Sequence, residues 1–131
     1  MIYLDSTAVA KLVQREDESG ALRMWLDQQV DAPWVGSALL EVEVFRAVMR
    51  AEPEVAAELY CVLDMIEAVE PGPAVRRFAL GPDTATVSTL GAIHLGTALS
   101  LVGITAFVTY DKRLAEAAEL AGLPVFSPGA S

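Results

Sequence analysis

The chain has 131 residues and a formal net charge of −9, with 18 acidic and 9 basic side chains. Hydrophobic residues make up 53% of it, which excludes a disordered chain, and the length fits one domain, residues 1–131, with a real core. An acidic chain is not a typical nucleic-acid binder, because phosphate contacts favour Lys and Arg. A carboxylate cluster that holds cations, or basic residues gathered on one face, would reconcile the charge with such a function.

The number of cysteines and the length of the apolar runs indicate in which cellular compartment the chain would function. Cys61 is the lone cysteine, so an intramolecular disulfide is excluded and a reducing cytoplasm suits the chain. Cys61 lies in an apolar helical pattern, and we expect it in the core rather than as a catalytic thiol. No signal-peptide pattern is visible, and the longest apolar run falls far short of the ~20 residues that a membrane span needs. The sequence therefore predicts a cytoplasmic protein without a membrane segment.

Short apolar runs alternate with amphipathic segments along the whole chain. After a first strand we expect Ser6 to be the N-cap of the next helix and Ser19 the N-cap of the second. Strands or extended segments are predicted at residues 2–4, 31–36, 66–69, 105–109 and 124–126. Helices are predicted at residues 7–13, 19–28, 37–51, 53–64, 73–80, 89–102 and 112–121. A turn is expected at 81–84 and a disordered tail at 127–131.

This alternation predicts an α/β fold of three layers, in which a short parallel sheet has helices on both faces. Ligands of such sheets bind at the carboxyl ends of the strands. Asp5 follows the first strand, Asp111 follows the strand at 105–109, and Glu43 lies in the helix at 37–51. We expect these acids to converge at one edge of the sheet, where carboxylates suit Mg²⁺ or Mn²⁺. Asp5 and Asp111 also fit a helix-capping role.

Several neighbours of these acids have two interpretations. Glu41 and Glu43 point in nearly opposite directions on a helix, so only one faces the site. Arg46 is three residues after Glu43, and an ion pair between them would either compete with metal binding or hold the carboxylate in place. His94 lies on an apolar helical stripe and is expected as a packed core residue. The basic residues that follow the strand ends either surround the site or are scattered solvated charges: Lys11, Arg15, Lys112 and Arg113.

Four segments in this order resemble the PIN-domain ribonucleases, specifically the VapC toxins of bacterial VapBC toxin–antitoxin pairs. They are MIYLDSTAVAKL, SALLEVEVFRA, TLGAIHLGTAL and AFVTYDKRL, and the resemblance covers nearly the whole chain. The second segment matches a Glu-aliphatic-x-Arg-Ala pattern whose register favours Glu43 over Glu41. The resemblance implies a metal-dependent endoribonuclease with Asp5, Glu43 and Asp111 as catalytic acids. It further implies Asp5 and Asp111 as ligands of Mg²⁺ or Mn²⁺, supported by hydrogen bonds from Ser6 and Thr109.

The same resemblance implies substrates and partners. The substrate would be structured, partly single-stranded RNA, either tRNA or ribosomal RNA. The partner would be a VapB-type antitoxin whose C-terminal segment lies across the toxin groove, where a basic segment suits the acids. A homodimer is also implied. Four apolar side chains either serve that dimer or belong to the core: Val42, Phe45, Val48 and Met49.

One acid of the family pattern is missing, because Leu-Asp-Ala-Ile-His-Leu is written here with Gly91 in place of Asp. Three explanations of Gly91 compete. It is an engineered change that abolishes toxicity, it marks a natural degenerate toxin that still binds antitoxin, or another acid of the chain takes its place. Asp83 is a poor candidate for that acid, since it is predicted in a turn. Fewer carboxylates mean weaker metal binding, so we expect reduced or absent ribonuclease activity.

Two other functions compete with the nuclease. One is a catalytically inactive PIN domain that binds antitoxin or RNA, which Gly91 favours. The other is a receiver-like signalling domain, also α/β with an acidic pocket. It shares only the placement of Asp residues after strands and is disfavoured.

Overall fold

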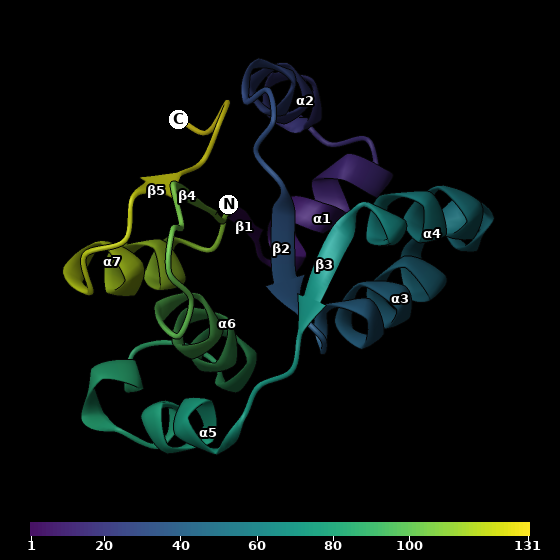
Figure 1. Cartoon of the computed structure of the whole chain (residues 1–131). Coiled ribbons are helices and arrows are strands. Elements are labelled where there is room, and N and C mark those ends of the chain that lie inside the picture. The colour runs from purple at the N-terminus through teal and green to yellow at the C-terminus, as the bar shows by residue number, and fades with distance from the viewer.

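The computed structural model describes residues 1–131 apart from the side chain of Asp83. The hypothesis that Asp83 takes the place of the missing acid therefore lies outside the described residues. One five-stranded parallel sheet lies at the centre, in the order β3-β2-β1-β4-β5 (Figure 1). Its strands are β1 (Ile2–Leu4), β2 (Trp34–Ser37), β3 (Ile66–Val69), β4 (Ala106–Val108) and β5 (Val125–Phe126). The predicted parallel sheet is confirmed.

Helices occupy the connections between strands. They are α1 (Ser6–Val13), α2 (Ser19–Gln28), α3 (Leu40–Ala51), α4 (Ala56–Asp64), α5 (Pro73–Ala79), α6 (Thr89–Leu99) and α7 (Lys112–Leu120), with 3₁₀ turns at Pro53–Val55 and Pro82–Thr84. Helix α6 ends three residues earlier than predicted, and α3 begins three residues later. Ser37 is instead the last residue of β2, where it pairs with Val69 of β3.

The two faces of the sheet are covered by different helices. On β1, Ile2 and Leu4 face a cluster built with α1, α2, α3 and α4, whereas Tyr3 faces a cluster built with α6 and α7. Successive side chains of a strand point to opposite faces, so one fully buried strand contributes to both cores. Figure 1 shows α1, α3 and α4 on one side of the strands and α6 and α7 on the other. The three-layer prediction is confirmed.

The first turn after β1 differs from the prediction. Asp5, not Ser6, is the N-cap of α1, and its Oδ1 accepts a hydrogen bond from Ala8 N. Ser19 is also not a cap, because its Oγ accepts from Glu16 N and donates to the carbonyl of Gln14. Asp5 therefore has a structural role in α1 in addition to any chemical one.

Two further expectations are wrong. Cys61 is exposed, because α4 turns Leu59 and Val62 to the core instead. The tail is ordered beside β4, where Ser127 Oγ donates to the carbonyl of Thr109 at 2.5 Å and Tyr110 Oη donates to the carbonyl of Pro128 at 2.7 Å. Among the described helices, none has both the length and the apolar character to cross a bilayer.

The chain order defines a switch point in the sheet. From β1 the chain builds outward to β2 and β3, and it then returns to add β4 and β5 on the other side of β1. Ligands of open α/β sheets bind outside the carboxyl ends of the strands at such a point, here between β1 and β4. Asp5 follows β1 and Thr109 follows β4, so both lie at this position.

Candidate functional site

Asp5 is buried at the carboxyl end of β1, with 1% of its surface exposed. Its Oδ1 accepts from Thr7 Oγ1 at 2.6 Å and from Ala8 N at 3.0 Å, and its Oδ2 accepts from Thr109 Oγ1 at 2.5 Å. Burial raises the pKa of Asp5, and the hydrogen bonds from Thr109 and Thr7 oppose that rise. The predicted contact from Thr109 is present. The second hydroxyl comes from Thr7 rather than from Ser6.

Asp111 is connected to Asp5 through one hydroxyl. The backbone N–H of Asp111 donates to Thr109 Oγ1 at 3.1 Å, and that oxygen in turn donates to Asp5. The backbone N–H of Tyr110 donates to Thr7 Oγ1 at 2.9 Å, which fixes the turn after β4 against α1. The Asp111 side chain caps α7, since its Oδ1 accepts from the N–H groups of Arg113 and Leu114. The fold thus brings the turns after β1 and β4 together.

Glu43 is held by a buried histidine. His94 Nε2 lies 2.7 Å from Glu43 Oε1, and His94 Nδ1 lies 2.8 Å from the hydroxyl of Tyr3. Burial raises the pKa of Tyr3 far above its usual value, so Tyr3 keeps its proton. When the Tyr3 hydroxyl donates to Nδ1, His94 carries a proton on Nε2 and donates it to Glu43.

The sequence predicted the burial of His94 but not its contacts. His94 is 2% exposed, as expected for a core residue on α6. Its partners lie 91 positions away on β1 and 51 positions away on α3, distances at which local patterns carry no information. The one available signal was a lone polar ring on an otherwise apolar stripe, since such a ring needs two partners when it is buried.

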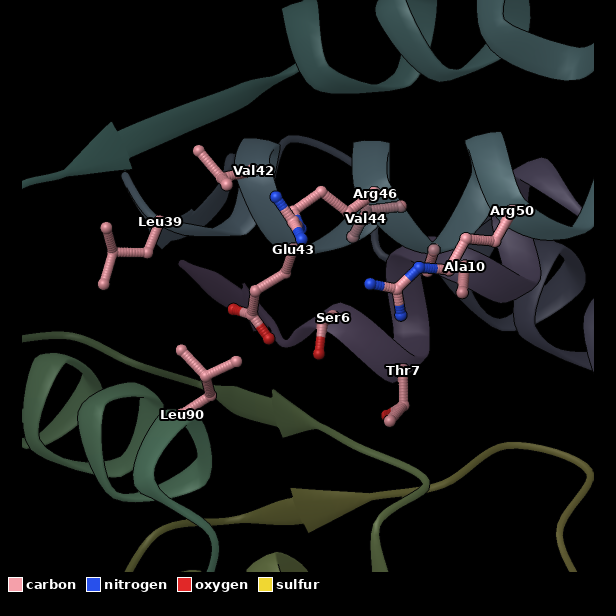
Figure 2. A pocket seen from close by; sticks show the side chains of 11 residues that line it. Ser6, Thr7, Ala10, Leu39, Val42, Glu43, Val44, Arg46, Arg50 and Leu90 are labelled. Atoms are coloured by element: carbon pink, nitrogen blue, oxygen red, sulfur yellow. The ribbon is translucent and has the colours of Figure 1, made fainter. Parts of the chain in front are cut away.

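A groove of about 540 Å³ opens beside Glu43, between α1, α3 and the start of α6 (Figure 2). Figure 2 shows the Glu43 carboxylate turned into the space between Ser6 and Leu90. Farther along α3, the side chain of Arg50 reaches toward α1 above Thr7. The remaining lining residues are Ala10, Leu39, Val42, Val44, Arg46 and Ala47. The groove is therefore aliphatic, with one acid and two arginines.

The structure separates the alternatives for Arg46 and Lys11. Glu43 pairs with His94, and no ion pair joins Glu43 to Arg46 in the described part of the chain. Lys11 does not reach toward the acids of the site, because its Nζ binds Glu16 at 2.7 Å and Glu18 at 2.8 Å and lies over the ring of Tyr110.

Known proteins match this arrangement over nearly the whole chain. The PIN domain family model matches residues 2–120. Ribonuclease VapC35 of Mycobacterium tuberculosis is 42% identical over 132 residues, 98% of either chain, and Ribonuclease VapC47 of the same species is 39% identical over 139 residues, 99% of this chain and 98% of that one. The chain belongs to the PIN domain family. Its relatives within that family are VapC-type ribonucleases, as the sequence resemblance implied.

Solved PIN-type structures agree with the fold. Mycobacterium tuberculosis VapC20, described as a sarcin-ricin loop cleaving toxin, superposes with a TM-score of 0.74 at 16% identity and covers 98% of this chain and 100% of its own. FitAcB from Neisseria gonorrhoeae gives a TM-score of 0.72 at 17% identity, with 98% of both chains covered. At such identities the likeness concerns the fold alone.

Gly91, the position at which the sequence resemblance implies an acid, is buried in the first turn of α6. Ser88 Oγ caps that helix by accepting from Gly91 N at 3.0 Å. A Cβ atom added at Gly91 would meet the same Ser88 oxygen at 3.1 Å, which is tight, with Val87 and Leu114 at ordinary contact distances of 3.5 and 3.9 Å. A side chain at position 91 therefore requires Ser88 to shift by a few tenths of an ångström.

The acids of this PIN domain have the right chemistry for a hard divalent ion, but they are one fewer than the family resemblance implies. Carboxylate oxygens suit Mg²⁺ and Mn²⁺. Both Asp5 oxygens already accept hydrogen bonds, Asp111 caps a helix, and Glu43 is bound to His94. Among the residues whose side chains are described, no three Asp, Glu, His or Cys gather as a set that would hold a metal.

Proposed function

We propose that this PIN domain is the endoribonuclease toxin of a VapBC toxin–antitoxin pair. Its substrate would be structured RNA, tRNA or ribosomal RNA, in the cytoplasm. The observation that carries the proposal is the junction of Asp5 and Asp111 through Thr109 at the switch point of the sheet, in a chain 42% identical to Ribonuclease VapC35. The position suits a substrate that approaches from outside the carboxyl ends of the strands.

The proposed roles follow from how each acid is held. Asp5 and Asp111 are the proposed ligands of Mg²⁺ or Mn²⁺, and Glu43 is the third catalytic acid. Thr109 and Thr7 orient Asp5 through their hydroxyls, and Ser6, which lines the groove, is the proposed hydroxyl that hydrogen-bonds to bound water there. When bound, such an ion stabilises the charge that develops on a phosphodiester and lowers the pKa of a bound water.

We further propose that Gly91 reduces the activity, because it removes one carboxylate from the cluster. The test compares the chain with Gly91→Asp, Gly91→Asn and Gly91→Ala. The Asn variant has nearly the shape of Asp without its charge, and the Ala variant adds only the Cβ atom that approaches Ser88. Calorimetry with Mn²⁺ and cleavage of total tRNA and of ribosomal RNA are measured for all four proteins.

We expect Gly91→Asp alone to bind Mn²⁺ more tightly and to cleave RNA faster. Equal gains for Asp and Asn would show that shape, not charge, was missing. Cleavage by the unaltered chain at the rate of Gly91→Asp would contradict the impairment. If no variant binds metal or cuts RNA, the nuclease proposal fails.

A specific observation favours a second candidate, a catalytically inactive PIN domain that binds antitoxin or RNA. Asp5 is buried with three hydrogen bonds to its carboxylate, and Gly91 leaves the cluster without the additional acid that the family resemblance implies. Binding of RNA or of an antitoxin with no cleavage by Gly91→Asp would support this alternative.

A VapB-type antitoxin and a second copy of the chain are the proposed protein partners. Of the four apolar residues considered for a dimer, Val48 is fully buried and Phe45 packs against the core. Val42 and Met49 are 57% and 44% exposed and remain available. Light scattering of the purified chain tests the dimer, with Met49→Glu expected to shift it toward monomer.

A further inference from the structure

The groove beside Glu43 contains two arginines that form no ion pair with any described carboxylate. Arg46 and Arg50 are both exposed, lie one turn apart on α3, and line the same groove. In the part of the chain that the structure describes, neither forms an ion pair, whereas Lys11 binds two glutamates. Like charges at this spacing repel each other along a helix. An anion in the groove would relieve that repulsion.

The lining of the groove limits the kind of anion. Guanidinium groups form flat donor forks that match phosphate oxygens in a bidentate manner. The lining has no aromatic ring on which a base would stack and no amide side chain to read a base edge. Recognition here would therefore act through charge and shape, as contacts to a nucleic-acid backbone do.

Charge and position point to the same ligand. The chain carries a net charge of −9, so RNA binding requires a local concentration of positive charge. Arg46 and Arg50 follow Glu43 by three and seven residues on α3, and Figure 2 shows the guanidinium of Arg46 turned back toward Glu43 and that of Arg50 farther along the same wall of the groove. A strand whose reacting phosphodiester lay at the acids would place neighbouring phosphates at these arginines.

We propose that Arg46 and Arg50 form a phosphate-binding subsite for single-stranded RNA that flanks the bond at the acids. This inference rests on the proposed ribonuclease function, since it takes RNA as the ligand. The subsite supplies affinity without base specificity, and sequence preference must come from elsewhere on the molecule.

The test measures RNA binding without cleavage. A fluorescently labelled, unstructured oligouridine is titrated with the protein in EDTA at several NaCl concentrations. For single strands, each phosphate contact contributes about 0.7 to the slope of log K against log salt concentration. We expect Arg46→Gln/Arg50→Gln to bind at least ten-fold more weakly at low salt, with a slope reduced by about 1.4.

The matched control is Arg76→Gln/Arg77→Gln, which removes the same charge from exposed positions on α5 that do not line the groove. We expect this control to keep most of the affinity and the slope. Equal losses for both double variants would show a general charge effect and would overturn the inference. Unchanged RNA binding by the groove variant would also overturn the inference. The same holds if the groove variant keeps its RNA affinity but no longer binds a Glu-rich peptide, because the arginines would then serve a protein partner.

Binding and cleavage separate this inference from the proposed function. Because the titration contains no metal, an inactive chain still reports on the subsite. RNA binding that depends on Arg46 and Arg50, together with no cleavage by Gly91→Asp, would uphold the subsite and refute the nuclease. Cleavage by Gly91→Asp with RNA affinity independent of both arginines would uphold the nuclease and refute the subsite.

Discussion

Asp5 and Glu43 are held at the site by different means. Asp5 takes two of its hydrogen bonds from residues two and three positions along the chain and a third from Thr109, which directly follows the neighbouring strand β4. Among the described residues, the Glu43 side chain is hydrogen-bonded only to His94 on α6, and His94 is in turn held by Tyr3 of β1. Asp5 is therefore fixed as soon as β1, α1 and β4 assemble, while Glu43 depends on packing across both layers of helices. Variants at the two acids should differ accordingly.

The largest expected effect is at Asp5. Asp5→Ala removes the N-cap of α1 and leaves two hydroxyls without their acceptor, that of the buried Thr109 and that of the half-buried Thr7. We expect a loss of about 3 kcal/mol in the free energy of unfolding. Urea denaturation followed by fluorescence of Trp25 and Trp34 measures it. Asp5→Asn keeps one acceptor oxygen and should lose less. Stability of Asp5→Ala equal to the unaltered chain would contradict the hydrogen bonds described here.

His94→Leu should have the second largest effect, a loss of about 2 kcal/mol in the free energy of unfolding. The substitution leaves the buried hydroxyl of Tyr3 and the carboxylate of Glu43 without their hydrogen-bond partner. The same urea experiment measures it, and a double-mutant cycle with Tyr3→Phe sharpens it. In the Tyr3→Phe background there is no Tyr3 hydroxyl, so removal of His94 leaves one fewer buried polar group without a partner than it does in the unaltered chain. The double variant should therefore be more stable than the sum of the single losses predicts. Strict additivity would mean that Tyr3 and His94 do not interact.

The two acids also differ in how well the sequence predicted them. A strand that ends in Asp, followed by a helix, places Asp5 from local information, although the sequence assigned the cap to Ser6. Strand positions and both helical layers followed from alternation, and Glu43 was chosen over Glu41 by the family register. The His94 contacts, the role of Thr7 and the ordered tail were not predictable, because each depends on residues brought together only by the folded sheet.

The ordered tail provides the third prediction. Deletion of residues 127–131 removes the bond from Ser127 to the carbonyl of Thr109 and the bond from Tyr110 to the carbonyl of Pro128. We expect a loss of about 1–2 kcal/mol, felt at the turn after β4 beside Asp5 and not at Glu43. Hydrogen exchange of the backbone N–H groups of Tyr110 and Asp111 measures the local effect. Deletion of residues 130–131 alone keeps both bonds and serves as the control; faster exchange there would contradict this account.

The smallest expected effect concerns Lys11, whose glutamate partners lie outside the site. Burial works to lower the pKa of Lys11, but hydrogen bonds to Glu16 and Glu18 outweigh it and raise that pKa above 10.5, while the bond from Lys11 lowers the pKa of Glu18 below 4.5. The raised pKa of Lys11 contributes stability that is lost as the pH rises through the pKa of Lys11 in the folded state. The lowered pKa of Glu18 contributes stability that is lost as the pH falls through the pKa of Glu18 in the folded state. Lys11→Met should therefore be less stable than the unaltered chain between these limits, and the difference should shrink below about pH 4.5 and above about pH 10.5. Thermal unfolding at several pH values measures the difference, and a gap that stays constant across that range would show that Lys11 acts by packing over Tyr110 rather than by charge.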